Sequence, residues 1–154
     1  MRTSRSHGFT LVEMLVTLAI FAVLLMIALP SMRPFLQSQS VKNASMDIVS
    51  TVALARSEAI KRNATVDVTA SNAADWSQGW VVSQGTRVIR KQGALGNIAI
   101  TPSSASFSFD GNGRMTSTGA TFAIAPVNKT SQPLCLSVTV GATGRTESTK
   151  VSCP

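Results

Sequence analysis

Hydrophobic and polar positions divide the chain into three parts. Residues 9–29 are almost uniformly apolar, which is long enough for one helix across a bilayer. Residues 41–59 instead repeat apolar residues at steps of three and four, the pattern of an amphipathic helix with one buried stripe. From residue 64 onward, short runs rich in β-branched and aromatic residues alternate with turn residues. The pattern therefore predicts an α+β fold, in which a long helix precedes an antiparallel sheet.

The amphipathic part of the helix is expected to pack on the chain's own sheet rather than on a ligand. Its stripe consists of Val41, Ala44, Ile48, Val52, Ala55 and Ala59. Glu58 stands one turn before Lys61 and Arg62, a spacing that favours ion pairs on the helix surface. Pro30 and Pro34 each lack a backbone donor, so we expect a kink or a locally melted turn there.

Strands are expected once helicity ends near Asn63. The predicted strands are Thr65–Ala70, Gly79–Ser83, Arg87–Lys91, Ile98–Thr101, Ser106–Phe109, Thr121–Ala125, Leu134–Val140 and roughly Ser148–Cys153. Gln84–Thr86 and Asp110–Gly113 have the composition of hairpin turns. The second of these superficially resembles a calcium loop, but it lacks the later bidentate glutamate, so a β-turn is expected. Trp76 and Trp80 suit either a ligand platform or the core, and burial is the expected role.

The start of the apolar run carries one carboxylate, Glu13, which is costly in a membrane segment and calls for a partner. One interpretation is a secretory signal that is cut near Ala28, but Met26 stands where such a site needs a small residue. A second is a plain membrane anchor, with Arg2 and Arg5 holding the N-terminus in the cytoplasm. Neither interpretation accounts for the glutamate.

A third interpretation accounts for it, because Gly8-Phe9-Thr10-Leu11-Val12-Glu13 closely resembles the processing site of type IV prepilins and pseudopilins. The resemblance implies cleavage between Gly8 and Phe9, methylation of the new amine of Phe9 and retention of the apolar run. It also implies that Glu13 pairs with the N-terminal amine of a neighbouring subunit. Such a pair would neutralise a charge that is otherwise stranded in hydrocarbon or in a helical filament core.

The middle of the chain is similar to the GspH/FimT family of minor pilins and pseudopilins. The similarity lies in Leu54–Asn63 (LARSEAIKRN), Asp75–Trp80 (DWSQGW) and Phe107–Arg114 (FSFDGNGR). It implies a pilin-like fold with a long N-terminal helix packed on antiparallel β-sheet. It also implies a low-copy subunit near a filament tip.

This resemblance predicts a domain organisation and a cellular route. The parts are a cleaved leader (1–8), a transmembrane and filament-core helix (9–30), an amphipathic continuation (31–63) and a β-rich domain (64–154). The expected place is the inner membrane in a single pass, with a cytoplasmic N-terminus and a periplasmic domain, and then the pilus surface. The expected partners are other pilins, the prepilin peptidase and the inner-membrane assembly platform.

Composition argues against an enzyme. The only histidine, His7, lies in the leader, so the mature chain lacks the residue for a Ser-His-Asp triad or a histidine-ligated zinc site. No grouping of carboxylates, cysteine or serine indicates catalysis, and no cofactor or metal is predicted.

Two cysteines, Cys135 and Cys153, stand in the part expected to be exported. An oxidising compartment favours a disulfide between them, and the alternative is two buried free thiols. If they face each other across a final hairpin, its midpoint is Gly144 and Arg145 lies at or beside the tip.

The charge of the chain raises the question of nucleic acid. The formal net charge is +7, or +5 without the leader, which suits a negative partner such as DNA or anionic lipid. Family members linked to natural transformation share a C-terminal Gly-Arg-x-Arg motif that contacts DNA. Gly144-Arg145-Thr146-Glu147 matches its first half, and Glu147 departs from it because a carboxylate repels phosphate.

The candidate DNA-binding residues are Arg145, Lys150, Arg114 and Lys129, with Arg87, Arg90 and Lys91 as a second basic group. Contacts to phosphate would be tolerant of sequence and sensitive to salt, whereas the alternative is a solvated basic face. Two functions follow from the sequence. The first is a minor type IV pilin that supports assembly and captures double-stranded DNA for uptake. The second is a minor pseudopilin of a type II secretion system with no role in DNA binding.

Overall fold

The computed structural model describes residues 9–128 and 133–153. The chain divides into an N-terminal unit that ends at Phe35 and a domain that begins at Leu36. One helix, α1 (Leu11–Arg62), contributes to both. It continues through Pro30 and Pro34, so the expectation of a locally melted turn is wrong. Each proline removes one hydrogen bond of the helix and crowds the carbonyl four residues earlier, but its fixed φ is compatible with a helix and the other hydrogen bonds of the helix remain possible.

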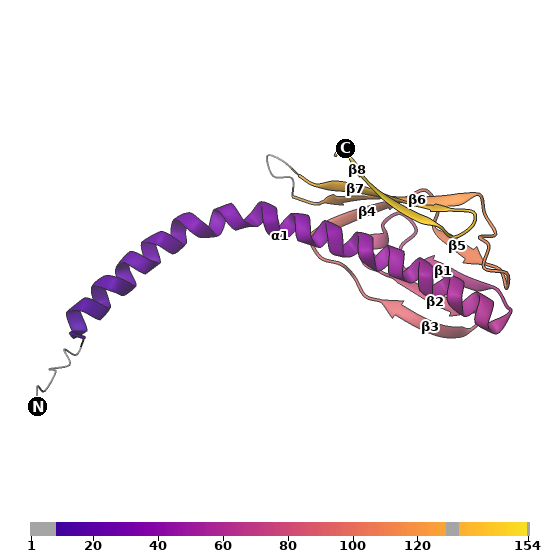
Figure 1. The fold of residues 1–154 in the computed structure, drawn as a ribbon, viewed down its shortest axis with the longest axis horizontal. Coiled ribbons are helices and arrows are strands. Elements are labelled where there is room, and N and C mark those ends of the chain that lie inside the picture. The colour runs from indigo at the N-terminus through magenta and orange to yellow at the C-terminus, as the bar shows by residue number, and fades with distance from the viewer. Residues whose placement is uncertain (1–8, 129–132, 154) are drawn as a thin grey trace, which may run out of the picture. The chain divides into compact units, whose positions relative to one another are not determined.

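Within the described residues, eight strands follow the helix, as predicted, but they form two antiparallel sheets instead of one. The first sheet has the order β3-β2-β1-β5 and the second β4-β6-β7-β8 (Figure 1). The strands of the first sheet are β1 (Val66–Ala70), β2 (Trp80–Gln84), β3 (Arg87–Gln92) and β5 (Ser106–Phe109). Those of the second are β4 (Ile98–Pro102), β6 (Gly119–Pro126), β7 (Cys135–Gly141) and β8 (Thr146–Val151). The α+β class is confirmed.

The predicted helical stripe forms one side of the core. All six of its residues are at most 1% exposed. Alternate residues of both sheets complete the same cluster, namely Val66, Val68 and Val82 from the first sheet and Ile100, Phe122, Ile124, Val138 and Val140 from the second. The helix ends where expected, since Asn63 has a φ of 45° and α1 stops at Arg62.

An aromatic cluster joins the two sheets within this core. Trp76 stacks on Phe107 of β5, with ring centroids 5.8 Å apart, and meets Phe122 of β6 edge-on at 4.7 Å. The indole Nε1 of Trp80 donates to Thr51 Oγ1 of α1 at 3.0 Å. Both tryptophans are 1% exposed, which confirms the expected burial.

A short 3₁₀ helix, η1 (Trp76–Gln78), brings Trp76 into the cluster, and the sequence pattern does not predict it. Asp75 caps η1, because its carboxylate accepts hydrogen bonds from the backbone and hydroxyl of Ser77. The same carboxylate accepts from the backbone N of Ile100 in β4 at 3.3 Å. Partial burial alone would raise the pKa of Asp75, but these hydrogen bonds outweigh it and the pKa is lowered.

Candidate functional site

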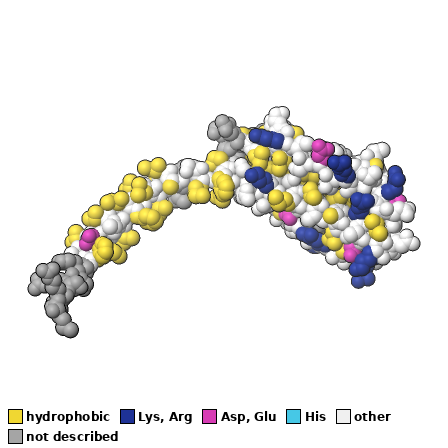
Figure 2. Space-filling model, in the orientation of Figure 1, with side chains coloured by type: hydrophobic (Ala, Val, Ile, Leu, Met, Phe, Trp, Pro, Cys, Tyr) yellow, Lys and Arg dark blue, Asp and Glu magenta, His cyan; other side chains and the backbone are white. Residues whose placement is uncertain are grey.

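The first half of α1 exposes its apolar side chains. Residues 11–28 have a mean hydropathy of 2.7 and none of this span is buried, so its length and composition suit a membrane crossing. Figure 2 shows hydrophobic side chains along this segment. Phe9 is 76% exposed and Ile27 is 72% exposed. A surface of this kind requires lipid or other protein chains around it.

Glu13 lies in the first turn of α1. Thr10 Oγ1 accepts from the backbone N of Glu13 at 3.2 Å, and Thr10 O accepts from Met14 N, so Thr10 caps the helix. The positive end of the helix dipole favours a carboxylate at this position. Within the described residues, the Glu13 side chain has no ion-pair partner. Gly8, the other half of the predicted cleavage site, lies outside them.

The last two strands form the predicted hairpin, and a disulfide closes it. Cys135 and Cys153 are bonded, with Cα atoms 5.3 Å apart, which rules out the alternative of free thiols. At the other end, Gly141 N donates to Arg145 O at 2.8 Å across the turn. Gly144 has a φ of 75°, a conformation that favours glycine. Arg145 therefore lies beside the tip, as predicted.

Arg56 of α1 and two arginines of neighbouring turns lie at or beside this tip. Met115 N donates to Ala142 O at 2.9 Å, which joins the Asp110–Arg114 turn to the β7–β8 turn. The side chain of Arg56 from α1 passes over both turns. A Cβ atom added at Gly113 would lie 3.2 Å from Arg56 Nε. One added at Gly144 would lie 2.9 Å from Arg56 Cδ. We call Arg56, Arg114 and Arg145 the arginine cluster.

All three members of the arginine cluster are exposed, and none forms an ion pair within the described residues. Two cationic groups on joined turns and a third on the neighbouring helix suit a phosphate-bearing polymer. Sequence reasoning missed Arg56, although the residue stands in one of the segments used for the family resemblance. Only the two small turns beside it, each with a glycine at positive φ, bring it to the site.

The other candidate cations lie elsewhere. Lys150 pairs in register with Leu136, near the disulfide end of β8, and is therefore apart from the arginine cluster. Lys129 lies outside the described residues. Arg87, Arg90 and Lys91 stand on β3, in the other sheet. Glu147 is exposed on β8, two residues after Arg145.

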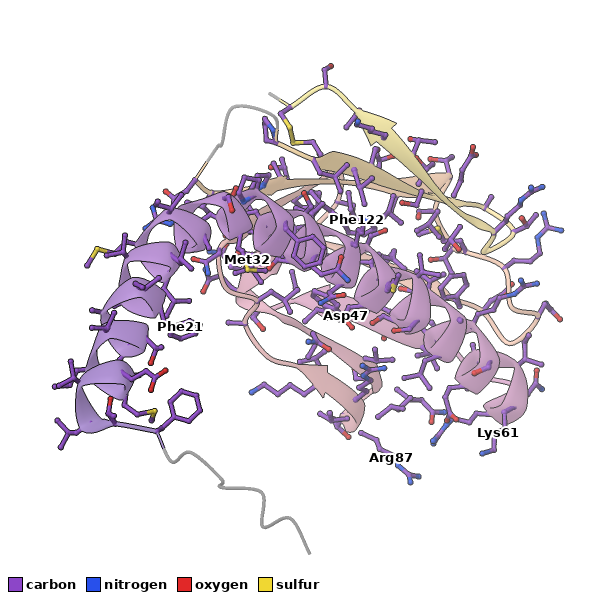
Figure 3. The ribbon with its side chains drawn as sticks, turned by 60° about the vertical axis from the view of Figure 1, so that its left-hand side comes forward. Phe21, Met32, Asp47, Lys61, Arg87 and Phe122 are labelled. Atoms are coloured by element: carbon purple, nitrogen blue, oxygen red, sulfur yellow. A yellow bond between two sulfur atoms is a disulfide. The ribbon has the colours of Figure 1, made fainter. Side chains whose placement is uncertain are left out.

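A separate group of charges at the end of α1 is partly neutralised. Glu58 accepts from Arg62 Nε at 2.6 Å and lies 3.9 Å from Lys61 Nζ, which confirms the predicted pairs. The hydrogen bond from Arg62 and the nearby cations lower the pKa of Glu58. Figure 3 labels Lys61 at the end of α1 and Arg87 at the start of β3.

The Asp110–Gly113 segment is a turn, as predicted. Asp110 Oδ1 accepts from the backbone N atoms of Asn112 and Arg114, so the carboxylate stabilises the turn. In the part of the chain that the structure describes, no three His, Cys, Asp or Glu residues are grouped as metal ligands would be.

Comparison with known proteins gives a family and a fold. The family described as "Type II transport protein GspH" matches residues 44–144, and the "Prokaryotic N-terminal methylation motif" matches residues 3–29. No curated protein sequence gives a significant match.

Two crystal structures of the type IV minor pilin FimU of Pseudomonas aeruginosa have a similar fold. Each is 23% identical in sequence, with TM-scores of 0.60 and 0.58. The matches cover 74% and 70% of this chain and 91% of FimU in both cases. At this identity the likeness shows the fold alone. The family match spans most of the domain and the motif spans the apolar helix, so the chain belongs to the GspH/FimT family of type IV pilin-like proteins.

Proposed function

We propose that this chain is a minor subunit of a type IV pilus, carried on the filament in low copy near its tip. The matched methylation motif supports processing between Gly8 and Phe9. The exposed apolar half of α1 supports a subunit that first sits in the inner membrane, with its domain in the periplasm, and then packs among neighbouring helices. Its partners are other pilins, the prepilin peptidase and the assembly platform, and the subunit is structural rather than enzymatic.

Glu13 is the docking residue in this proposal. A filament packs apolar helices against one another, so the carboxylate loses water and requires a counter-charge. Cleavage before Phe9 creates one on each incoming subunit. Glu13 already faces the positive end of its own helix, and a neighbour's amine would complete the neutralisation.

Intact-mass measurement of the chain from its host membrane tests the processing. We expect a mature chain that starts at Phe9 and carries one methyl group. A mature start near Ser31 would instead identify an ordinary signal peptide. Glu13→Gln should leave cleavage intact and abolish incorporation into the filament, because the amide cannot neutralise an amine.

The arginine cluster is the observation that carries the second part of the proposal, which is capture of double-stranded DNA for uptake. Its members lie on two joined turns and one helix, so the contacts would go to backbone phosphates and would not read sequence. Lys150 and Lys129 remain secondary candidates. Glu147, close to the cluster, is expected to weaken the attraction.

Titration of the full chain, solubilised in neutral detergent, with a duplex at several salt concentrations tests this binding. Three phosphate contacts predict a slope of log affinity against log salt of about −2.7, and loss of one contact should reduce it by about 0.9. Arg145→Ala, Arg114→Ala and Arg56→Ala should each do so. Arg90→Ala removes the same charge from β3 and serves as the matched control. Glu147→Arg, which restores the family motif, should tighten binding.

A minor pseudopilin of a type II secretion system, with no role in DNA binding, is the second candidate. Glu147 at the last position of the motif favours it. No shift of duplex DNA even at low ionic strength would support this alternative. Deletion in the host then separates the two candidates, since loss of pili indicates the first and loss of secreted enzymes the second.

A further inference from the structure

A groove of about 510 Å³ lies between α1 and the second sheet, within the domain. Its apolar lining comes from Met46, Val49 and Ala53 on one face of α1 and from Leu136 of β7. Met46 is 66% exposed although it stands beside the buried stripe. Ser45 Oγ and Ser148 Oγ lie 3.0 Å apart across the groove and link the helix to β8. An apolar lining with this much exposure suits a further chain.

The strand beside the groove is an edge with unused backbone groups. β8 pairs with β7 alone in the described sheet. The bond from Gly141 N to Arg145 O fixes which pairs of the hairpin exchange hydrogen bonds, because these alternate along an antiparallel ladder. By that alternation the N–H and C=O groups of Thr146, Ser148 and Lys150 point away from β7. An added strand could pair with them.

Cations stand at both ends of the groove. Ser45 of α1 meets Ser148 of β8, while Arg56 of α1 meets Gly144, so the helix and β8 run in opposite directions. Lys42 lies on the groove one turn before Ser45, and Lys150 lies two residues after Ser148, at the same end. The arginine cluster lies at the other end. A segment that fits this groove is therefore apolar in its middle and acidic at its ends.

No segment of this chain has the composition that the groove requires, which argues against a second copy of the chain as the occupant. It has 7 acidic residues against 14 basic ones. Glu58, Asp67, Asp75 and Asp110 already accept hydrogen bonds within the domain. Asp47 and Glu147 are far apart in sequence and Glu13 lies in the apolar run. Val66–Val68 does alternate around Asp67, but it is paired on both sides within β1 and is not free to bind elsewhere.

We propose that the groove receives an extended, acidic segment of a different protein, which adds to β8 as a fifth strand and places alternate apolar side chains against Met46 and Val49 of α1. This interaction goes beyond the proposed function and does not depend on DNA binding. Duplex DNA suits the groove less well, because its charged backbone would lose hydration against an apolar lining.

A labelled peptide, Asp-Asp-Val-Thr-Val-Thr-Val-Asp-Asp, tests the proposal by fluorescence anisotropy with the full chain in neutral detergent. We expect saturable binding that is lost when lysines replace the four aspartates. Met46→Glu should weaken binding at least tenfold, because it puts a carboxylate on the lining. Val88→Glu places the same group on β3 at a residue that is 59% exposed, and it should leave binding unchanged.

Strand addition has its own test in a pair of variants at one position. Ser148→Ala removes the hydroxyl and keeps the outward N–H, so it should bind the peptide nearly as wild type does. Ser148→Pro removes that N–H without removing a bond to β7, and it should weaken binding about tenfold or more. Both variants lose the Ser45–Ser148 hydrogen bond, so an intact disulfide and equal melting temperatures of the two variants check their fold.

Equal binding by Ser148→Pro and Ser148→Ala, or by Met46→Glu and wild type, would overturn the proposal. Loss of duplex binding by Met46→Glu would also overturn it, in favour of DNA in the groove. Failure of DNA binding is a separate outcome, since it appears in the salt titration of Arg114→Ala and Arg56→Ala and leaves the effect of Ser148→Pro intact.

Discussion

The two halves of α1 belong to one helix, but the first half exposes its apolar side chains and the second half buries a stripe of them. In the first half, large side chains such as Leu11 and Ile27 are 74% and 72% exposed. In the second half, small ones such as Val41, Ala55 and Ala59 are fully buried. The sheets of the domain thus pack on the stripe of mostly small residues spaced at three and four. The larger apolar side chains of the first half remain exposed and available to other molecules. Hydrophobicity alone does not tell where a residue packs; the spacing and the size of its neighbours do.

The largest expected effect comes from a matched pair of phenylalanines, Phe122 and Phe21, which Figure 3 labels. Phe122 is 0% exposed in the core, whereas Phe21 is 58% exposed on the first half of α1. Phe122→Ala should lower the free energy of unfolding of the domain by about 3–5 kcal/mol. Phe21→Ala should leave it unchanged in detergent. Urea unfolding followed by near-ultraviolet circular dichroism measures both. A lower free energy of unfolding in Phe21→Ala would contradict the independence of the two halves of α1.

The disulfide joins β7 to the segment after β8, in the sheet that packs on the second half of α1. Cys135 and Cys153 are 18 residues apart in sequence. Cys153→Ser should therefore cost about 3 kcal/mol, mainly because the unfolded chain regains freedom. We expect the variant to be more sensitive to protease in β7 and β8, while the first half of α1 in micelles is cut at the same rate as before. The free Cys135 should be blocked with an alkylating reagent after unfolding, as a check that it has not formed a new bond.

The buried stripe of α1 and most of the strands that pack on it could be predicted from the sequence, because local periodicity determines them. The spacing of Val41, Ile48 and Val52 predicts a buried stripe, and alternation with turn residues predicts all eight strands. The order of strands within the two sheets could not be predicted, since period-two patterns show which face is buried and leave the neighbour open. The 3₁₀ helix at Trp76 is too short to leave a periodic pattern.

The candidate site was less predictable than the fold. Arg145 could be placed near the hairpin tip because two cysteines and a glycine fix the length of that hairpin. Arg56 stands about ninety residues earlier and comes to the same place only through tertiary packing against Gly113 and Gly144. Lys150 lies close to Arg145 in sequence, but an extended strand separates them. Lys150 was therefore wrongly grouped with Arg145 because the two are close in sequence. Arg56 was not predicted because it is far from Arg145 in sequence.

A smaller effect is expected from two threonines of α1. Thr51 Oγ1 accepts from the buried Trp80 Nε1, whereas Thr17 Oγ1 only donates to Met14 O on the exposed half. Thr51→Val keeps the shape and leaves the indole N–H without a partner, so it should cost about 1–3 kcal/mol. Thr17→Val should cost nothing measurable in the domain. Thermal unfolding and the indole proton resonance of Trp80 report the two outcomes. An unmoved resonance in Thr51→Val would contradict the hydrogen bond between Trp80 and Thr51.

The smallest effect is expected at Asp75, whose carboxylate ties η1 to β4 and so holds Trp76 in the aromatic cluster. Its pKa is lowered in the folded domain, so its contribution to stability is full above the pKa of the unfolded chain and is lost as pH falls through the folded pKa. Asp75→Asn should therefore be less stable by about 1 kcal/mol near neutral pH, and the gap should close in strong acid, where wild type is protonated too. Ser77→Ala, which removes one donor to the carboxylate, should show a smaller gap with the same direction. Urea midpoints at neutral and at acidic pH measure this, and a gap that widens in acid would contradict the assignment. Asp75 contacts only residues of the domain, Ser77 and Ile100 among them. The structure of the micelle-bound half of α1 should therefore not change when Asp75 is titrated. This titration tests whether the two halves of α1 are independent.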